Sequence, residues 1–192
     1  MVRDAVEVER AQAYALLGRL LSAPPDAALL ARLRLLRGDT SPFGAALGAL
    51  AAAAANMDEA AVEQEFFDLF IGVGRGELLP YASYYLTGFL HERPLAELRA
   101  ELRRLGVARA PGVAEPEDHI GFGCEVLAGL LEDRFGAGPG APDAFFAKHL
   151  QPWAGRFFAD LEAAVAARFY RAVGLLGRTM VGIEQEAAGL PA

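Results

Sequence analysis

Cysteine and histidine are scarce in this sequence, which holds one cysteine and three histidines in 192 residues. The single cysteine, Cys124, forms no internal disulfide and builds no thiolate metal cage, which is typical of a protein kept in a reducing compartment. We interpret it as a small buried hydrophobic residue. Di-iron bundles use Glu-x-x-His pairs, and no histidine here follows a glutamate at that spacing. The sequence therefore predicts no metal site.

Long runs of large apolar residues are also missing, although 54% of the residues are hydrophobic. Residues 40–57 carry no charge, but they are mostly alanine and glycine, whereas leucine, isoleucine, phenylalanine and valine drive membrane insertion. We expect these residues to form a helix that packs closely on its neighbours. The amino terminus has neither the apolar core nor the cleavage site of a secretory signal. We predict a cytoplasmic protein without stable membrane insertion.

Positive charge is in deficit, with 18 lysines and arginines against 25 aspartates and glutamates. A net charge of −7 disfavours nucleic acid and anionic membrane as partners, because both repel an acidic surface. It favours a basic ligand wherever the acidic residues gather.

Strand-type alternation is absent, while apolar residues recur at helical spacing from end to end. The sequence predicts an all-α fold, one compact helical domain over residues 1–192, with an irregular, hinge-like loop around residues 106–115. Pro94, Pro142 and Pro152 are each expected in the first turn of a helix. The expected apolar helix faces are Tyr14, Leu17 and Leu21; Val62, Phe66, Leu69 and Phe70; Leu95, Leu98, Leu102 and Leu105; Ile120, Cys124, Leu127 and Leu131; and one long final stripe from Phe158 to Ile183.

Motifs of catalysis and nucleotide binding are incomplete. The segment GVGRG, residues 72–76, lacks the third glycine of a dinucleotide fingerprint, because Glu77 stands at that position. Neither a phosphate loop nor a Gly-x-Ser-x-Gly elbow is present. We interpret residues 72–76 as a flexible loop and expect a protein that is not an enzyme and has no cofactor. A weak contact with a guanine nucleotide at this loop stays open.

The segment EPEDHI, Glu115 to Ile120, gathers three carboxylates, a proline and a histidine. Pro116 suits the first position of a helix, and Asp118 then falls in the first turn, where negative charge meets the helix dipole. Glu115 and His119 lie four residues apart, so a helix would place them on one face. A histidine beside carboxylates can hold a proton or present a hydrogen-bonding edge to a ligand. The pattern predicts a polar site at the mouth of a helix.

The segment PYASYY, residues 80–85, holds three of the five tyrosines. In a helix Tyr81 and Tyr85 share a face, and Tyr84 lies about 60° away, so all three do not fit one core without burying their hydroxyl groups. Core packing and a peptide-binding groove both remain open for this segment. An acidic helix mouth beside it favours the groove.

These segments, in this order, resemble the TorD/DmsD family of redox-enzyme maturation chaperones. The likeness rests on YALLGRLLSAPP, EFFDLFIGVG, PYASYY and, most specifically, EPEDHI, with a looser match in HLQPWAGRFFADL. The resemblance implies an all-helical cytoplasmic protein, monomeric or dimeric. It implies as partners the twin-arginine leader and catalytic subunit of a molybdenum oxidoreductase, whose export is delayed until the cofactor is inserted. The peptide-binding residues that it implies, together with the tyrosine cluster, are Tyr81, Ser83, Tyr84, Tyr85, Glu115, Pro116, Asp118 and His119, with Tyr14 as a lesser candidate.

The residue chemistry suggests how such a leader would bind. Glu115 and Asp118 would attract the guanidinium groups, and the aromatic segment would take up the apolar part. We expect replacing Asp118 or His119 by alanine to weaken leader binding and leave the fold nearly intact. Three alternatives stay open: a nitrate-reductase-type chaperone whose client is not exported, a nucleotide hydrolase that uses residues 72–76, and a structural assembly subunit.

Overall fold

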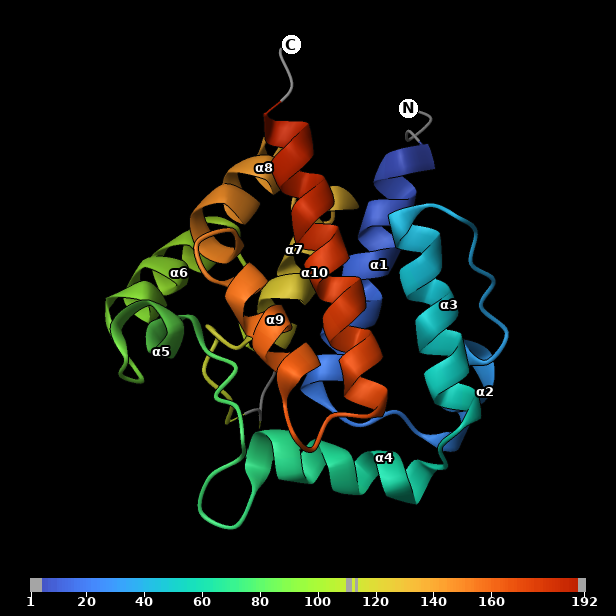
Figure 1. Cartoon of the computed structure of the whole chain (residues 1–192). Coiled ribbons are helices and arrows are strands. Elements are labelled where there is room, and N and C mark those ends of the chain that lie inside the picture. Colours follow the sequence, from blue (N-terminus) through green and yellow to red (C-terminus); the bar gives the residue numbers. More distant parts are fainter. Residues whose placement is uncertain (1–4, 110–111, 113, 190–192) are drawn as a thin grey trace. The chain divides into compact units, whose positions relative to one another are not determined.

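The computed structural model describes residues 5–109, 112 and 114–189. Residues 110, 111 and 113 of the predicted hinge-like loop lie outside the described residues. Every regular element in the described ranges is helical, which confirms the all-α fold (Figure 1). The elements are α1 (Ala5–Ser22), α2 (Ala27–Leu33), α3 (Pro42–Ala55), α4 (Glu59–Phe66), the π-helical turn η1 (Phe67–Ile71), α5 (Ala82–Thr87), α6 (Arg93–Arg104), α7 (Ile120–Leu131), α8 (Ala141–Phe145), the π-helical turn η2 (Phe146–Leu150), α9 (Ala154–Ala163) and α10 (Phe169–Ala188).

The chain divides into two compact units, each made of two separate stretches of sequence. Unit 1 contains residues 1–22 and 80–153, and unit 2 contains residues 23–79 and 154–192. The single domain predicted for residues 1–192 stays a prediction. Both unit 1 stretches contribute to one core, so neither stretch is a folding unit by itself.

In unit 1, α1 packs along α7 at short distance. A Cβ atom added at Gly18 would lie 2.6 Å from Glu125 Cγ, and one added at Gly121 would lie 2.5 Å from Ser22 Oγ. Glycine at these two positions lets the helix backbones approach closely. The predicted stripes of both helices are confirmed, because Tyr14, Leu17, Leu21, Ile120, Cys124, Leu127 and Leu131 are all buried.

The remaining helices of unit 1 follow the proline and glycine signals in part. Pro94 lies in the first turn of α6, and Gly106 ends that helix with a φ of +68°, in the left-handed region that suits glycine. Pro142 lies in the first turn of α8 as predicted. The prediction for Pro152 is wrong, since the next helix begins two residues later, at Ala154.

In unit 2, α10 runs between α9 and α3 in Figure 1, and it contacts both. The small-residue helix predicted over residues 40–57 is confirmed as α3, which buries Ala46, Leu50 and Ala54. A Cβ atom at Gly177 of α10 would lie 2.1 Å from the Phe158 ring, so glycine again permits close packing. Among the described residues, no helix is both long and apolar enough to cross a membrane.

The long final helix predicted from Phe158 to Ile183 is wrong, because the chain leaves helical geometry between α9 and α10. Two carboxylates from distant sequence hold the break. Glu65 accepts hydrogen bonds from three consecutive backbone N–H groups, of Arg168 (2.8 Å), Phe169 (3.0 Å) and Tyr170 (2.7 Å). Glu77 accepts from the N–H groups of residues 165 and 166. The bonds to Glu65 satisfy free donors at the start of α10, and those to Glu77 hold the loop before it. The apolar periodicity of the sequence carries no signal of either.

Candidate functional site

Helix α7 begins at Ile120, four residues later than the EPEDHI pattern predicts. His119 stands before it in an extended conformation, with φ −65° and ψ 137°, and its Nδ1 accepts a hydrogen bond from Gly121 N–H at 3.0 Å. The predicted first turn at Pro116 is therefore wrong. Glu115 and His119 do not share a helix face, because the residues between them form a turn.

The reason for the late start is a short pairing of two chain segments. Ala82 N–H donates to the backbone oxygen of Asp118 at 2.9 Å, and Ile120 N–H donates to that of Pro80 at 2.9 Å. Tyr81 and His119 thus face each other in an isolated antiparallel bridge. The predicted helix face shared by Tyr81 and Tyr85 is wrong for the same reason, since Tyr81 is extended and precedes α5. The bridge brings the tyrosine segment and the acidic segment together.

Asp118 is buried, with 3% of its surface exposed, and it holds the tyrosine segment in place. Its Oδ2 accepts the N–H of Ser83 at 2.9 Å. Ser83 is fully buried, and its Oγ accepts the N–H of Glu92 at 3.2 Å, which ties the start of α6 to the same cluster. The carboxylate of Asp118 bonds inward to the backbone of Ser83, so it is not presented to a peptide at the surface. We therefore revise the roles of Asp118 and Ser83 to positioning, and we no longer expect alanine at 118 to leave the fold intact.

Glu115 is exposed and receives a hydrogen bond from the phenol of Tyr81. Burial, followed by the hydrogen bond to Glu115, raises the pKa of the Tyr81 phenol, so it remains a proton donor. The Tyr81 ring also lies edge to face with the His119 ring, at 5.4 Å between centroids. These contacts fix the direction of a solvent-exposed carboxylate.

The third carboxylate of the motif, Glu117, is already paired within the chain. Arg99 Nη2 lies 2.8 Å from Glu117 Oε2, and Arg109 Nε lies 3.8 Å from Glu117 Oε1. Burial would raise the pKa of Glu117, but the hydrogen bond from Arg99 and the two positive charges lower it overall. Arg109 also donates to the backbone oxygens of Ala114 and Glu115, at 3.1 and 2.9 Å. Sequence reasoning missed both arginines because they lie outside the motif.

The other two tyrosines lie half-buried beside a tryptophan. Tyr84 and Tyr85 are 6.0 Å apart between ring centroids, and Tyr85 lies 5.5 Å from Trp153. The indole N–H of Trp153 donates to the backbone oxygen of His149 at 2.8 Å. Sequence reasoning did not name Trp153 or His149 as site residues, although both lie within the looser family match HLQPWAGRFFADL.

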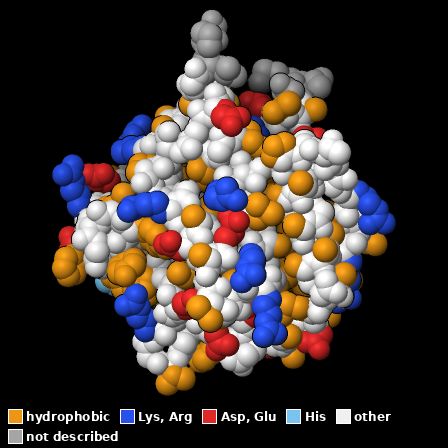
Figure 2. Space-filling model, in the orientation of Figure 1, with side chains coloured by type: hydrophobic (Ala, Val, Ile, Leu, Met, Phe, Trp, Pro, Cys, Tyr) orange, Lys and Arg blue, Asp and Glu red, His pale blue; other side chains and the backbone are white. Residues whose placement is uncertain are grey.

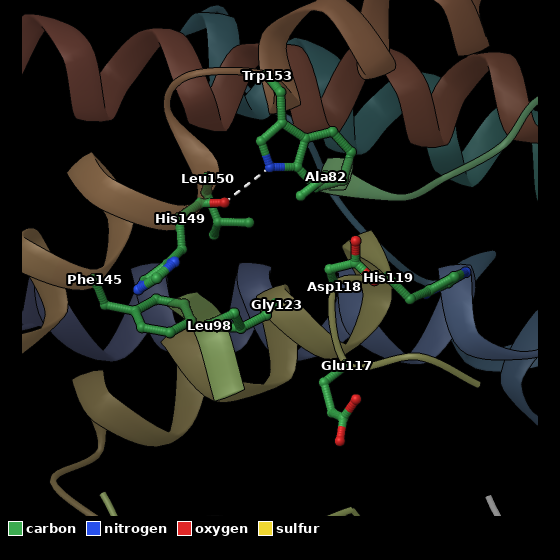
Figure 3. Close-up of a pocket in the computed structure, with 10 residues that line it drawn as sticks. All are labelled: Ala82, Leu98, Glu117, Asp118, His119, Gly123, Phe145, His149, Leu150 and Trp153. Atoms are coloured by element: carbon green, nitrogen blue, oxygen red, sulfur yellow. Dashed lines mark hydrogen bonds between the residues drawn. The ribbon is translucent and has the colours of Figure 1, made fainter. Parts of the chain in front are cut away.

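A cavity of about 10 Å³ lies behind these residues, with Phe145 and His149 at one end and Asp118 and His119 at the other (Figure 3). That volume admits about one water molecule, so the cavity holds no part of a peptide. His149 Nε2 is buried and has no hydrogen-bond partner among the described residues, so it can bind such a water. The full lining is Ala82, Leu98, Glu117, Asp118, His119, Gly123, Phe145, His149, Leu150 and Trp153.

The remaining predicted residues lie away from solvent or at the edge of the cluster. Tyr14 is 1% exposed in the core of unit 1, so it can support the site only through packing. Pro116 is half-buried in the turn before α7. Cys124 is buried as interpreted, and burial raises the pKa of its thiol, which keeps it protonated and unreactive.

Burial makes His119 a pH-dependent contributor to stability. It lowers the pKa of His119 to about 4, despite opposing effects of Glu115 and Asp118. Between pH 6.5 and about 4 the unfolded chain binds more protons than the folded chain at this residue, so stability is lost as the pH falls through that window. Above pH 6.5 the contribution is constant.

We expect His119→Asn to reduce this loss of stability at acidic pH. Asparagine retains an acceptor for the Gly121 N–H but does not titrate, and a full titration difference is worth about 1.4 kcal/mol per pH unit. Urea unfolding of both proteins at pH 7.5, 6, 5 and 4.5 measures the difference. If the free energy of unfolding depends on pH equally in the two proteins, His119 is not a neutral, buried residue.

Comparison with known protein families and with curated proteins shows which proteins this chain is similar to. Residues 37–159, which contain the tyrosine segment and the acidic segment, match the family described as nitrate reductase delta subunit. The match covers more than half of the chain. The chain belongs to this family.

Curated relatives are similar to this chain over part of their length. The chain is 33% identical over 103 residues to chaperone protein TorD of Aliivibrio fischeri, which covers 48% of either chain. It is 29% identical over 136 residues to chaperone protein TorD of Shewanella loihica, covering 65% of this chain and 61% of that one. The chain thus spans about half the length of the curated relatives that it matches. These matches confirm the resemblance to the TorD/DmsD family that the motifs indicate.

Proposed function

We propose that this protein is a cytoplasmic chaperone that binds the twin-arginine leader, or the apo form, of a molybdenum-containing redox enzyme. It delays export until the cofactor is inserted, and it catalyses no reaction. The named relatives are chaperones of the TorD type, which supports this class of function. The leader, the client and the delay of export belong to the proposal.

The observation that carries the proposal is the pairing of residues 80–82 with 118–120. It places an exposed carboxylate, Glu115, beside the half-buried Tyr81, which fixes its direction. A guanidinium group can add bonds to Glu115, since a carboxylate has more acceptor positions than the one Tyr81 uses. Asp118, His119 and Ser83 hold this arrangement from inside.

An exposed apolar surface continues from the tyrosines. Leu86, Phe89 and Leu90 follow Tyr85 along the chain, and they are 42%, 70% and 40% exposed. Figure 2 shows hydrophobic side chains gathered over α5 on this face of the molecule. A twin-arginine leader joins a cationic start to an apolar middle, so a unit that exposes both a carboxylate and apolar side chains suits both of its parts. No covalent step is needed for holding and release.

A second candidate follows from the family description, nitrate reductase delta subunit. In this alternative the protein assembles a client that is not exported, and the same surface binds a segment of the apo catalytic subunit. The two candidates differ in the ligand and share the site.

We expect Glu115→Gln to weaken a fluorescein-labelled twin-arginine leader peptide about tenfold, a loss of about 1.4 kcal/mol. The glutamine keeps the size of the side chain and an acceptor for Tyr81, but it removes the charge that a guanidinium meets. Fluorescence anisotropy measures the affinity. Raising the salt concentration should weaken binding to the unchanged protein more than binding to the variant, because salt screens exposed charges.

The matched control is Glu63→Gln, since Glu63 is an exposed glutamate on α4. It changes the net charge equally and should leave the affinity within twofold. If both variants bind the leader like the parent, the leader proposal fails. Binding of the apo catalytic subunit, but not of its leader, would instead support the assembly of a client that is not exported.

A further inference from the structure

A second, larger cavity lies in unit 1 at the carboxyl end of α7. Its volume is about 380 Å³, within the range of ligand sites. It is formed by the start of α1, the end of α7, the loop that follows, and the start of α8. Its lining is Glu7, Leu130, Leu131, Glu132, Asp133, Gly138, Pro139 and Pro142. The leader site proposed above uses none of these residues.

The inner wall of the cavity is apolar and firmly packed. Leu130, Leu131 and Pro142 are buried, so their side chains form a fixed surface. The loop after α7 is anchored by Phe135, whose ring occupies the space that a side chain at Gly129 would need, 2.6 Å from a Cβ placed there. A wall held in this way keeps the cavity open without a ligand.

The rim of the cavity is acidic and only partly neutralised. Glu132 pairs with Arg134. Within the part of the chain that the structure describes, Glu7 and Asp133 form no ion pair with another side chain. Arg10 of α1 pairs with Asp143 of α8, with 3.1 Å between Arg10 Nη2 and Asp143 Oδ1. Two carboxylates beside an apolar wall complement a ligand that is both cationic and apolar.

We propose that this cavity binds a second, cationic and apolar segment of the client polypeptide, an arginine or lysine flanked by leucine-like side chains. The inference rests on the proposed function for its choice of client. The positive group would meet Glu7 and Asp133, and its apolar neighbour would contact Leu131 and Pro142. The acidic segment and this cavity lie at opposite ends of α7.

The length of α7 allows one polypeptide to reach both sites. Its 12 residues correspond to about 18 Å, which about six extended residues span. A linked second segment then binds at an effective concentration on the order of 1 mM. If the segment alone binds with a Kd of about 0.1 mM, linkage tightens the whole peptide about tenfold.

Two labelled peptides test this inference. The short probe carries an Arg-Arg pair and a 12-residue apolar block; the long probe adds a six-residue Gly-Ser spacer and the tail Leu-Arg-Leu-Arg. We expect the long probe to bind the parent protein about tenfold more tightly than the short one. The double variant Glu7→Gln/Asp133→Asn should lose this gain and bind the short probe within twofold of the parent.

The variants are chosen to preserve the fold. Asp133 has a φ of +52°, a conformation that asparagine tolerates, so Asp133→Asn removes the charge without backbone strain. The control Glu63→Gln/Glu186→Gln changes two exposed glutamates and gives the same net charge. The inference is overturned if the long probe still binds Glu7→Gln/Asp133→Asn about tenfold more tightly than the short probe, as it should bind the control.

The tail peptide alone separates this inference from the leader proposal. Amide chemical shifts of Leu131 and Gly138 should move when Leu-Arg-Leu-Arg is added at millimolar concentration, even if the short probe does not bind. Unchanged shifts at these residues overturn the cavity as a binding site. If the short probe does not bind but the tail peptide still moves these chemical shifts, the leader proposal fails and the cavity inference stands.

Discussion

Glu65→Ala is expected to lower the free energy of unfolding by about 3 kcal/mol or more. The Glu65 side chain is buried, with 5% of its surface exposed, and it accepts the N–H groups of Arg168, Phe169 and Tyr170. Removing it leaves three donors without partners, two of them buried, at the start of α10. The substitution also removes a negative charge from the positive end of the α10 dipole, and this loss destabilises the fold further.

Urea unfolding followed by circular dichroism measures this loss. Glu63→Ala is the control, because Glu63 lies exposed on the same helix, α4, and its loss should stay within about 0.5 kcal/mol. Glu65→Gln is expected to fall between the two, since its amide retains one acceptor oxygen. A loss below 1 kcal/mol for Glu65→Ala would mean that solvent or another group replaces the carboxylate.

Asp118→Ala is expected to cost about 2–3 kcal/mol of stability and to weaken leader binding at least tenfold. The buried N–H of Ser83 loses its acceptor, and the segment that carries the tyrosines loses its side-chain anchor to residue 118. Asp118→Asn should be much milder, because its amide oxygen can accept the same N–H. The comparison separates the charge of Asp118 from its hydrogen bond.

Thermal melting and leader anisotropy are measured on the same preparations of the two variants. The expected order is parent, then Asp118→Asn within threefold in affinity, then Asp118→Ala. Equal and large losses of affinity in both variants, with melting unchanged, would show that the charge itself meets the leader. That outcome would contradict the positioning role assigned from the burial of Asp118.

The charges of the acidic motif divide into three different roles. Asp118 is buried and bonded to backbone, Glu117 is paired with Arg99 and Arg109, and Glu115 alone is exposed. A leader that brings guanidinium groups therefore has one carboxylate of the motif within direct reach. The cavity at the other end of α7 is lined by three further carboxylates in the same unit, of which Glu132 is paired with Arg134.

Sequence periodicity predicted the helices that bury one regular face. The stripes of α1, α6 and α7 lie where apolar spacing placed them, because a helix with such a face is stable only when that face is covered. The alanine-rich α3 was likewise predicted from its lack of large apolar residues. Pro94 and Gly106 predicted the two ends of α6, because each residue restricts or permits backbone conformations locally.

In two places where the sequence predictions were wrong, a contact between distant residues decided the local structure. The run 115–119 has good helix-starting residues, yet the pairing of residues 118–120 with residues 80–82 holds His119 extended and delays the start of α7 to Ile120. The final apolar stripe continues unbroken past residue 163, yet the carboxylates of Glu65 and Glu77 hold the backbone out of the helix there.

Local spacing and short motifs were enough to predict the all-α class, most of the helix faces and the resemblance to the TorD/DmsD family. Long-range packing settles which carboxylate of EPEDHI meets solvent and where α7 and α10 begin. It also formed the cavity at the end of α7. The physical reason is that hydrogen bonds between segments up to 105 residues apart compete with local helix formation, and spacing along the chain does not record them.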